Sequence, residues 1–527
     1  MSENKKVKSV HWADINADKI MREKGKKDHY TCASGVTPSG TVHIGNFREI
    51  ISVELVARAL KQKGENVRFI FSWDDYDVFR KVPKNMPEPE LLETFLRKPI
   101  TMVPDTRGNN ESYAQFNEKE LEGLLHVVGV SPEYIYQAPR YQSSEYAKGI
   151  RTALEKKAEI KAYLDEHRTT PLADDWWPVS VFSSFTQKDT TTVLGWDGEW
   201  GLTYRCDETG NEETVDLRET SIVKLPWRVD WPMRWALEDV DFEPAGKDHH
   251  SEGGSFDTSR NVVKVFGSEA PVTFQYDFIR IKGRGGKISS STGEVISLRD
   301  VLEIYQPEII RYLFVGTRPN TEFAISFDLD VLKIYEDYDK CERIYFGQQP
   351  INEKKKAKEL RNYELSQVGE VPTEMPYQIQ IRHLCNILQS NGGDIDAVIT
   401  SLPDVKADQI PRLRNRCECA WNWVKNFAPE DFRFALNTPG TATIEMTEAE
   451  LAAIKGLTEE VRKMDSHTEK SMAEAIYVVA HDHEVEPTEL FRLVYQILIS
   501  KEKGPRLAGF IMLCGKDKIL PILEAAL

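Results

Sequence analysis

The chain has 527 residues, 40% of them hydrophobic and 29% charged, which is typical of a globular protein with about three or four domains. Its net charge of −16 argues against a protein that coats nucleic acid or an anionic membrane. The sequence has neither a run of about 18 apolar residues nor an apolar signal core at its start, so we expect no membrane span and no secretion. Seven cysteines in this length predict a reducing, cytoplasmic location rather than a disulfide framework.

The first elements predicted along the chain are a strand, a helix and a second strand with short connections. Residues 30–34 are typical of a short buried strand, residues 43–63 carry apolar side chains at helical spacing, and residues 67–73 are predicted as the next strand. Gly64 follows the helix as a stop signal. Such a unit opens an α/β fold with a Rossmann-like, doubly wound parallel sheet.

The rest of the chain divides by composition and periodicity. Residues 81–225 are irregular and rich in Pro, Asp, Trp and Gly, which predicts an insertion, and the pattern after Leu298 is helical. A lysine run and a proline within residues 350–375 predict an exposed linker. We therefore predict four parts: an α/β domain of residues 1–80 and 226–298, an insertion at 81–225, a helical connecting domain at 299–350 and an α-helical domain at 351–527.

A glycine-bearing segment, Thr37-Pro-Ser-Gly-Thr-Val-His-Ile-Gly-Asn46, lies between the first strand and the helix. The N-terminus of a helix binds anions through free backbone N–H groups and the helix dipole, so this segment predicts a phosphate site. Gly40 and Gly45 permit close approach of a nucleotide, and His43 and Asn46 would donate hydrogen bonds to phosphate oxygens. Four residues such as His-Ile-Gly-Asn recur by chance, but their position between a strand and a helix favours the functional interpretation.

A second glycine-rich segment, Gly283-Arg-Gly-Gly-Lys-Ile-Ser-Ser-Ser-Thr-Gly293, follows the strand pattern at residues 272–281. Its hydroxyl groups and Lys287 suit a loop that closes over a triphosphate, where the lysine would neutralise charge on a leaving pyrophosphate. Glycine and serine alone usually indicate a solvated loop. The position after a strand, in the domain of the first motif, favours a role in binding.

Together the two motifs resemble the signature motifs of class I aminoacyl-tRNA synthetases, and further segments resemble the class I lysyl-tRNA synthetases. These segments extend over essentially the whole chain: Ser34-Gly-Val-Thr-Pro-Ser-Gly40, Asn46-Phe-Arg-Glu49, Ser72-Trp-Asp-Asp-Tyr-Asp77, Trp227-Arg-Val-Asp-Trp231, Phe278-Ile-Arg-Ile-Lys-Gly283 and Gly504-Pro-Arg-Leu507. The resemblance implies formation of lysyl-adenylate from L-lysine and ATP, and transfer of lysine to the 3′ end of tRNA(Lys). One departure is Ser290, which stands where the general class motif has a second lysine.

The resemblance also implies roles for single residues. His43, Asn46 and Lys287 would be catalytic. ATP would contact Thr37, Pro38, Ser39, Gly40, His43, Gly45, Asn46, Lys287, Ile288, Ser289, Ser290 and Ser291. L-Lysine would contact Gly35, Thr37, Asp74, Asp75, Trp227, His249 and Tyr276. Carboxylates suit the ammonium group of lysine and aromatic faces suit its stem, but the sequence leaves open which acid binds the ammonium, and Asp230 and Asp248 are further candidates.

The helical half resembles a cage that binds the anticodon. The residues predicted to contact tRNA there are Arg412, Arg416, Trp421, Lys501 and Lys503, although such residues on helices commonly form a solvated face or the core. We expect Mg²⁺ to arrive with ATP. We predict no structural zinc, because Thr209 stands where a C-x-x-C partner of Cys206 would be, and Cys417 and Cys419 point in different directions on a helix.

Three other interpretations stay open. A class I synthetase for glutamate or glutamine is disfavoured by the acidic segment at residues 73–77. A silent tRNA-binding paralogue is disfavoured because both motifs keep their phosphate-binding residue types. A nucleotidyltransferase for small molecules would leave the helical half without a role. The sequence does not determine the oligomeric state, for which we favour a monomer.

Overall fold

The computed structural model describes residues 9–84, 86–282, 295–442 and 444–527. Two compact units share these residues. The first unit comprises Met1–Val301, Pro307–Ile325 and Pro350–Val371, and the second comprises Leu302–Gln306, Ser326–Gln349 and Pro372–Leu527. The predicted site residues Lys287, Ile288, Ser289, Ser290 and Ser291 lie outside the described ranges.

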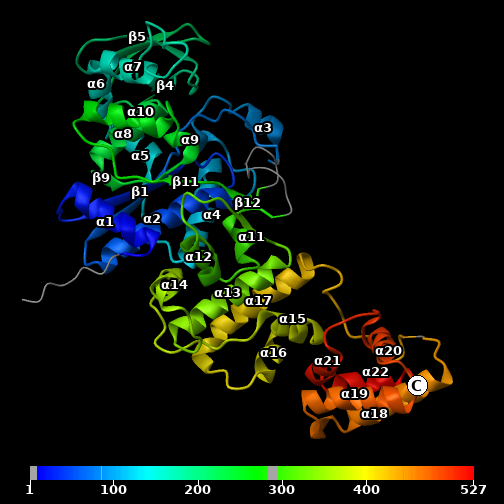
Figure 1. Cartoon of the computed structure of the whole chain (residues 1–527). Helices are drawn as coiled ribbons and strands as arrows, with labels where there is room; N and C mark the ends of the chain where they lie inside the picture. Colours follow the sequence, from blue (N-terminus) through cyan, green and yellow to red (C-terminus); the bar gives the residue numbers. More distant parts are fainter. Residues whose placement is uncertain (1–8, 85, 283–294, 443) are drawn as a thin grey trace, which may run out of the picture. The chain divides into compact units, whose positions relative to one another are not determined.

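A four-stranded parallel sheet lies at the centre of the first unit (Figure 1). Its strand order is β3-β2-β1-β9, with the strands Glu133–Tyr136, Val67–Trp73, Tyr30–Val36 and Val240–Phe242. Helix α2 (Ile44–Gln62) connects β1 to β2 and packs against both. Because the sheet grows from β1 first to one side and then to the other, the carboxyl end of β1 is a switch point of the kind that binds ligands. This topology confirms the predicted α/β fold class.

Local sequence explains the close packing of these elements. Apolar residues of α2, including Phe47, Ile51 and Leu55, are fully buried, as the helical spacing predicted. A Cβ atom at Gly35 would lie 2.9 Å from the carbonyl oxygen of Ser72, so glycine permits the close approach of β1 and β2. Helix α1 (Trp12–Lys24), which the sequence pattern did not predict, packs against α2.

The segment predicted as an insertion contributes to the main sheet. Strand β3 falls within residues 81–225, yet it pairs with β2 in parallel. A strand of four residues, of which Ile135 alone is buried, is a weak pattern, which explains why it was missed. The other elements of this segment are α3 (Pro89–Glu93), η1 (Ile100–Met102), α4 (Tyr113–Val127), α5 (Gln137–Gln142), α6 (Ala147–Glu155), α7 (Lys157–Asp165), the antiparallel pair β4 (Ser180–Val181) and β8 (Val223–Lys224), and an antiparallel sheet of β5 (Thr191–Trp196), β6 (Gly201–Cys206) and β7 (Glu212–Asp216).

The first unit also contains the elements that follow the insertion in sequence. They are α8 (Trp227–Leu237), α9 (Lys247–His250), α10 (Ser255–Val262), η2 (Val263–Phe266), the parallel pairs β10 (Ala245–Gly246) with β11 (Gln275–Tyr276) and β12 (Ile279–Ile281) with β13 (Phe323–Ile325), α11 (Leu298–Leu302), α12 (Pro307–Gly316) and α14 (Glu353–Ser366).

The predicted linker at residues 350–375 is wrong, because most of it is helix α14. This helix packs against α12, and the fully buried Arg311 donates hydrogen bonds to the carbonyl oxygen of Leu365. Arg361 forms an ion pair with Asp14 at 2.7 Å. A polar surface composition therefore concealed a helix that partners distant in sequence hold in place.

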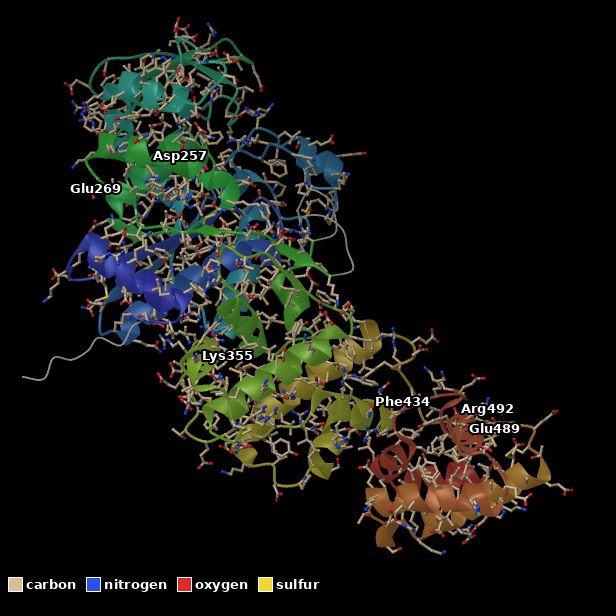
Figure 2. All side chains as sticks on the ribbon, in the orientation of Figure 1. Asp257, Glu269, Lys355, Phe434, Glu489 and Arg492 are labelled. Atoms are coloured by element: carbon tan, nitrogen blue, oxygen red, sulfur yellow. The ribbon has the colours of Figure 1, made fainter. Side chains whose placement is uncertain are left out.

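The second unit is helical, as predicted. Its helices are α13 (Asp330–Tyr345), α15 (Ile381–Ser390), α16 (Ile395–Ser401), η3 (Ala407–Gln409), α17 (Ile410–Asn426), α18 (Glu448–Arg462), η4 (Met464–Ser466), α19 (Glu469–Asp482), α20 (Pro487–Ile499), α21 (Leu507–Cys514) and α22 (Lys516–Glu524). Helices α18 to α22 share one apolar core, and the ring of Phe434 joins it by meeting Phe510 edge-on at 5.2 Å (Figure 2). Of the helices within the described ranges, none has the length and apolarity needed to cross a membrane.

Candidate active site

The predicted phosphate loop occupies the position that the sequence indicated, between β1 and α2. His43 is the N-cap residue of α2, and the backbone N–H of Ile44 donates to the carbonyl oxygen of Ile296 at 2.8 Å. A Cβ atom at Gly45 would lie 2.7 Å from Nδ1 of His43, so glycine makes room for the imidazole at the first turn. The loop is thereby attached to the segment that follows the second glycine-rich motif.

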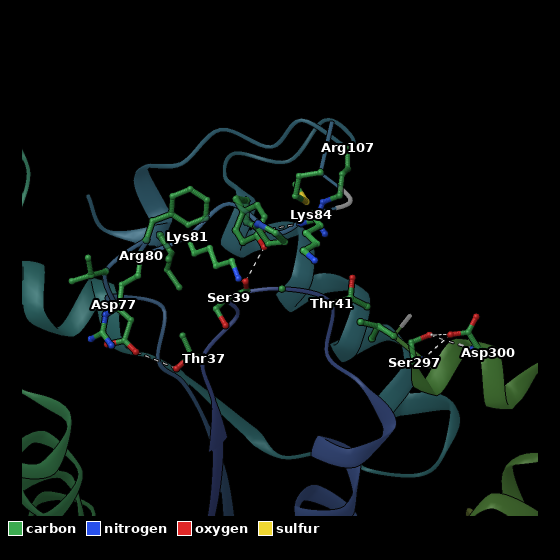
Figure 3. A pocket seen from close by; sticks show the side chains of 18 residues that line it. Thr37, Ser39, Thr41, Asp77, Arg80, Lys81, Lys84, Arg107, Ser297 and Asp300 are labelled. Atoms are coloured by element: carbon green, nitrogen blue, oxygen red, sulfur yellow. Dashed lines mark hydrogen bonds between the residues drawn. The ribbon is translucent and has the colours of Figure 1, made fainter. Parts of the chain in front are cut away.

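A cavity of about 590 Å³, here called the loop cavity, lies over this loop (Figure 3). Thr37, Ser39 and Gly40 line it, whereas Pro38, His43, Gly45 and Asn46 of the predicted ATP set are not part of its lining. Arg80, Lys81, Lys84 and Arg107 line it as well, and sequence reasoning missed all four. The signal in the sequence for Arg80, Lys81 and Lys84 is a short basic run after the acidic segment that follows the second strand, and Arg107 lies apart from that run.

Helix α4 holds the loop in place. Tyr113 donates its hydroxyl hydrogen to the carbonyl oxygen of Ser39 at 2.9 Å, and Nδ2 of Asn117 donates to the carbonyl oxygen of Pro38 at 3.0 Å. Both side chains are fully or almost fully buried. The loop conformation therefore depends on a helix some 75 residues away in sequence.

A second cavity of about 90 Å³, here called the tryptophan cavity, lies at the carboxyl ends of β1 and β9. Gly35, Asp74, Trp227 and His249, all predicted to contact L-lysine, line it. Trp231 and Trp235 complete an indole wall, in which the rings of Trp227 and Trp231 stack at 4.8 Å. The tandem aromatic residues of α8 therefore serve a cavity as well as the core.

The three acids that follow β2 are engaged by protein groups. Asp74 pairs with Arg234 at 2.7 Å, and Asp77 pairs with Lys224 at 2.7 Å. Asp75 accepts a hydrogen bond from the backbone N–H of Ala138 at 2.7 Å and lies outside the lining of the tryptophan cavity.

Electrostatic surroundings set the charge of these acids. Burial, and the nearby Asp74 carboxylate, raise the pKa of Asp75 to about 7, against the hydrogen bonds from backbone N–H groups. Burial acts in the same direction on Asp77, but Lys224 and the hydroxyl of Thr37, 3.1 Å away, outweigh it and lower the pKa of Asp77. Thr37 thus belongs to the loop cavity, although it was predicted for both substrates.

The tryptophan cavity is also lined by two glutamates that were not predicted from the sequence. Glu49 accepts hydrogen bonds from the hydroxyl groups of Ser34 at 2.8 Å and Tyr276 at 2.5 Å, which brings the predicted Tyr276 to the site. Glu243 accepts hydrogen bonds from the indole N–H groups of Trp231 at 3.1 Å and Trp235 at 2.6 Å.

Neither glutamate forms an ion pair with a cation in the described part of the chain. Burial, together with the Glu49 carboxylate, raises the pKa of Glu243 to about 8, and burial also raises the pKa of Glu49. The signals in the sequence were Glu49 within the resembling segment Asn46-Phe-Arg-Glu49 and Glu243 directly after a strand.

The predicted tRNA residues of the second unit differ in exposure. Arg416 is buried, pairs with Asp339 at 2.6 Å and lies over the ring of Tyr335. Arg412 pairs with Glu342 at 2.9 Å. The Arg416 side chain therefore stabilises the interior and is not presented to a partner.

The other predicted residues lie nearer the surface. Nζ of Lys501 donates to the carbonyl oxygen of Glu430, Lys503 is exposed, and Trp421 is half-buried. The ring of Trp421 is so close to Gly393 that a Cβ atom there would lie 2.2 Å from it. Of these three, Lys503 is the one that the surface presents fully.

The second unit has a cavity of its own, about 560 Å³, here called the aromatic cavity. Tyr477, Phe491, Tyr495, Lys470 and Arg506 line it, and the rings of Tyr477 and Phe491 meet edge-on at 5.7 Å. Tyr477 is 54% exposed. An exposed aromatic face beside cations can stack on an unpaired base and bind its phosphate.

Metal ligands require a separate description. Among the described residues, no group of three or more His, Cys, Asp or Glu side chains is arranged to hold a metal ion. All seven cysteines are free and buried. The absence of structural zinc stays a prediction.

The sheet topology, the loop at the N-terminus of α2 and the two cavities at the carboxyl edge together define a nucleotide-binding α/β protein of the kind the motifs indicated. The model of the family "tRNA synthetases class I (K)" matches residues 10–369. The chain belongs to this family.

Curated relatives match along almost their full length. A lysine–tRNA ligase of Borrelia garinii subsp. bavariensis is 55% identical, and the match covers 98% of this chain and 99% of the relative. A lysine–tRNA ligase of Thermococcus kodakarensis is 42% identical over 98% of this chain and 99% of the relative. A lysine–tRNA ligase of Methanosarcina barkeri is 33% identical over 98% of both chains. The resemblance stated from the motifs is thereby confirmed.

Proposed function

We propose that this chain is a class I lysine–tRNA ligase, which activates L-lysine with ATP and transfers it to the 3′ end of tRNA(Lys). The observation that carries the choice of amino acid is the tryptophan cavity, where Glu49 and Glu243 line a small space and the guanidinium in the lining, Arg234, is already paired with Asp74. Enclosing two carboxylates away from water is costly unless a positive charge joins them. The ε-ammonium of lysine supplies that charge.

The aromatic wall fits the remainder of the substrate. The stacked rings of Trp227 and Trp231 offer flat apolar faces to the methylene stem of lysine, and indole faces also attract a cation. Gly35 lines the cavity at the carboxyl end of β1, where the backbone of lysine would lie. A glutamate substrate would instead bring a third carboxylate to Glu49 and Glu243, which disfavours the glutamate alternative.

Activation requires positioning and charge stabilisation. A carboxylate oxygen of lysine attacks the α-phosphorus of ATP, the bond from that phosphorus to the oxygen bridging to the β-phosphate breaks, and pyrophosphate leaves with the electron pair. The loop before α2 supplies backbone N–H groups and the hydroxyls of Thr37 and Ser39 for the phosphates. We assign His43, Asn46 and Lys287 to the charge that develops on them. Mg²⁺ accompanies ATP and is coordinated chiefly by phosphate oxygens and water.

Transfer brings the tRNA into the reaction. A hydroxyl of the terminal ribose attacks the carbonyl carbon of lysyl-adenylate, and AMP leaves. We assign anticodon-loop contact to the second unit, through the aromatic cavity with Tyr477 and Arg506 and through the exposed Lys503. We also propose a cytoplasmic monomer, which agrees with seven free cysteines and with the reaction class.

The decisive experiment is pyrophosphate exchange with L-lysine, L-glutamate and L-glutamine in parallel, each with and without total tRNA. We expect exchange with lysine, and the tRNA arms are needed because a synthetase of this class can require tRNA before it activates its amino acid. Exchange with glutamate but not with lysine contradicts the proposal. Absence of exchange in every mixture, with tRNA still bound, assigns the chain to the silent paralogues.

A further inference from the structure

The loop cavity is lined by cations that have no role in the proposed reaction so far. Arg80, Lys81 and Lys84 line it from the segment after β2, and Arg107 lines it from the loop before α4. In the described part of the chain, Arg80, Lys81 and Lys84 have no carboxylate within ion-pair distance. Figure 3 shows the side chains of Lys81 and Lys84 directed toward the loop that carries Ser39 and Thr41.

Both carboxylates in the lining already have protein partners. Asp77 pairs with Lys224 at 2.7 Å, and Asp300 accepts hydrogen bonds from the backbone N–H and the hydroxyl of Ser297, each at 2.7 Å. Four cations thus line the cavity against two engaged carboxylates, in a chain whose net charge is −16. A concave site lined by one sign of charge concentrates ions of the other sign, so this cavity selects a polyanion.

The side chain of Asn117 fixes Arg107 relative to the phosphate loop. The amide of Asn117 donates to the carbonyl oxygen of Pro38 at 3.0 Å and accepts from a guanidinium N–H of Arg107 at 3.0 Å. The guanidinium of Arg107 also lies 3.8 Å from the ring centre of Phe116. The loop and Arg107 are therefore held in one arrangement before any ligand binds, which lowers the cost of binding.

We propose that Lys81 and Lys84, with Arg80 and Arg107, bind the β- and γ-phosphates of ATP and neutralise the pyrophosphate as it leaves. The proposal rests on the ligase function above and adds residues from outside both signature motifs. When the bond between the α-phosphorus and the bridging oxygen breaks, the electron pair stays on pyrophosphate, and cations already facing that group stabilise the new charge. A volume of about 590 Å³ with Thr37, Ser39 and Gly40 in its lining suits a nucleotide better than an RNA strand.

The test is the double variant Lys81→Ala/Lys84→Ala, compared with Lys354→Ala/Lys355→Ala. The control removes the same two charges from exposed positions on α14 (Lys355 is labelled in Figure 2), away from the cavity lining. In lysine-dependent pyrophosphate exchange at saturating tRNA, kcat/KM for ATP should fall roughly 100-fold in the first variant, at about tenfold per charge-assisted contact. It should stay within about twofold in the control, as should KM for lysine and for tRNA in both variants.

Calorimetric titration of ATP into the full-length chain needs no turnover and separates the two proposals. Weaker ATP binding by the cavity variant than by the control supports the proposed phosphate contacts. It does so even if lysine-dependent exchange is absent and the ligase proposal is wrong. If the two variants bind ATP equally and exchange pyrophosphate equally, the proposal that these cations bind the phosphates of ATP is wrong. A defect confined to tRNA binding also overturns it, because the cations would then serve RNA.

Discussion

The tryptophan cavity and the loop cavity lie at the same edge of one sheet, yet they have opposite charge. Gly35 at the end of β1 lines the first and Thr37 just after β1 lines the second, so a single residue, Val36, lies between them in sequence. The first contains Glu49 and Glu243, which form no ion pair among the described residues, and the guanidinium in its lining, Arg234, is paired with Asp74. The second contains Arg80, Lys81 and Lys84, which have no carboxylate partner in the described part of the chain. Each cavity thus offers ionisable groups outside ion pairs whose charge is opposite to that of one substrate, lysine or ATP, and this difference orients two ligands side by side.

The largest expected effect removes the negative charge of the tryptophan cavity. Glu49→Gln keeps the shape of the side chain but leaves the substrate ammonium without its partner, a loss of about 3–5 kcal/mol. We expect kcat/KM for lysine in pyrophosphate exchange to fall by about 1000-fold. Glu252→Gln, whose side chain is 89% exposed, is the control and should stay within about twofold. An unchanged Glu49→Gln enzyme would contradict the assignment of the ammonium site.

The second prediction concerns the pH dependence of stability. The pKa of Glu243 is raised to about 8 in the folded chain, from 4.5. Between these values the folded state binds more protons than the unfolded state, so the free energy of unfolding falls as pH rises, by at most about 1.4 kcal/mol per pH unit.

Urea unfolding of the ligand-free protein at pH 6 and pH 8 measures this loss. Glu243→Gln has no carboxyl group to titrate, so its loss between the two pH values should be smaller than that of the unmodified chain. If the free energy of unfolding falls equally in the two proteins, Glu243 is ionised in the empty cavity. The difference in charge between the two cavities would then exist without a bound ligand.

A third, smaller effect extends the comparison to the second unit, whose aromatic cavity combines apolar faces with cations. Tyr477→Ala removes one stacking face, worth about 1–3 kcal/mol per base, so tRNA affinity should fall about tenfold or more. Lysine activation at saturating tRNA should be unaffected. Val478→Ala, at an equally exposed neighbour outside the cavity lining, is the matched control for filter-binding measurements. Equal affinities of the two variants would remove the aromatic cavity from the tRNA site.

The smallest expected effect tests how α4 supports the loop cavity. Tyr113→Phe removes only the hydrogen bond to the carbonyl oxygen of Ser39 and keeps the ring. One neutral hydrogen bond contributes about 0.5–1.5 kcal/mol, so kcat/KM for ATP should fall about fivefold. KM for lysine, which binds in the other cavity, should not change. A larger effect on lysine than on ATP would mean that the two cavities do not act separately.

Much of the fold could be predicted because its patterns are local. The span of β2 matches the predicted residues 67–73, and α2 lies within the predicted 43–63. Apolar spacing and cap residues within one element were sufficient for these. Strand β3 and helix α14 were missed because pairing with β2 and contacts with Arg311 hold them, and neither partner is near in sequence.

The candidate site divides in the same way. The sequence by itself determined the family, the phosphate loop before α2 and the aromatic segment of α8, since these depend on residue type and spacing within short segments. Only the tertiary structure decided which charged groups come into contact. It paired Asp74 with Arg234, placed the carboxylate of Asp75 against the N–H of Ala138, and brought Glu49 and Glu243 into the lining of one cavity. The physical reason is that the net charge of a cavity depends on side chains from distant parts of the chain. A local sequence pattern contains no information about such long-range contacts.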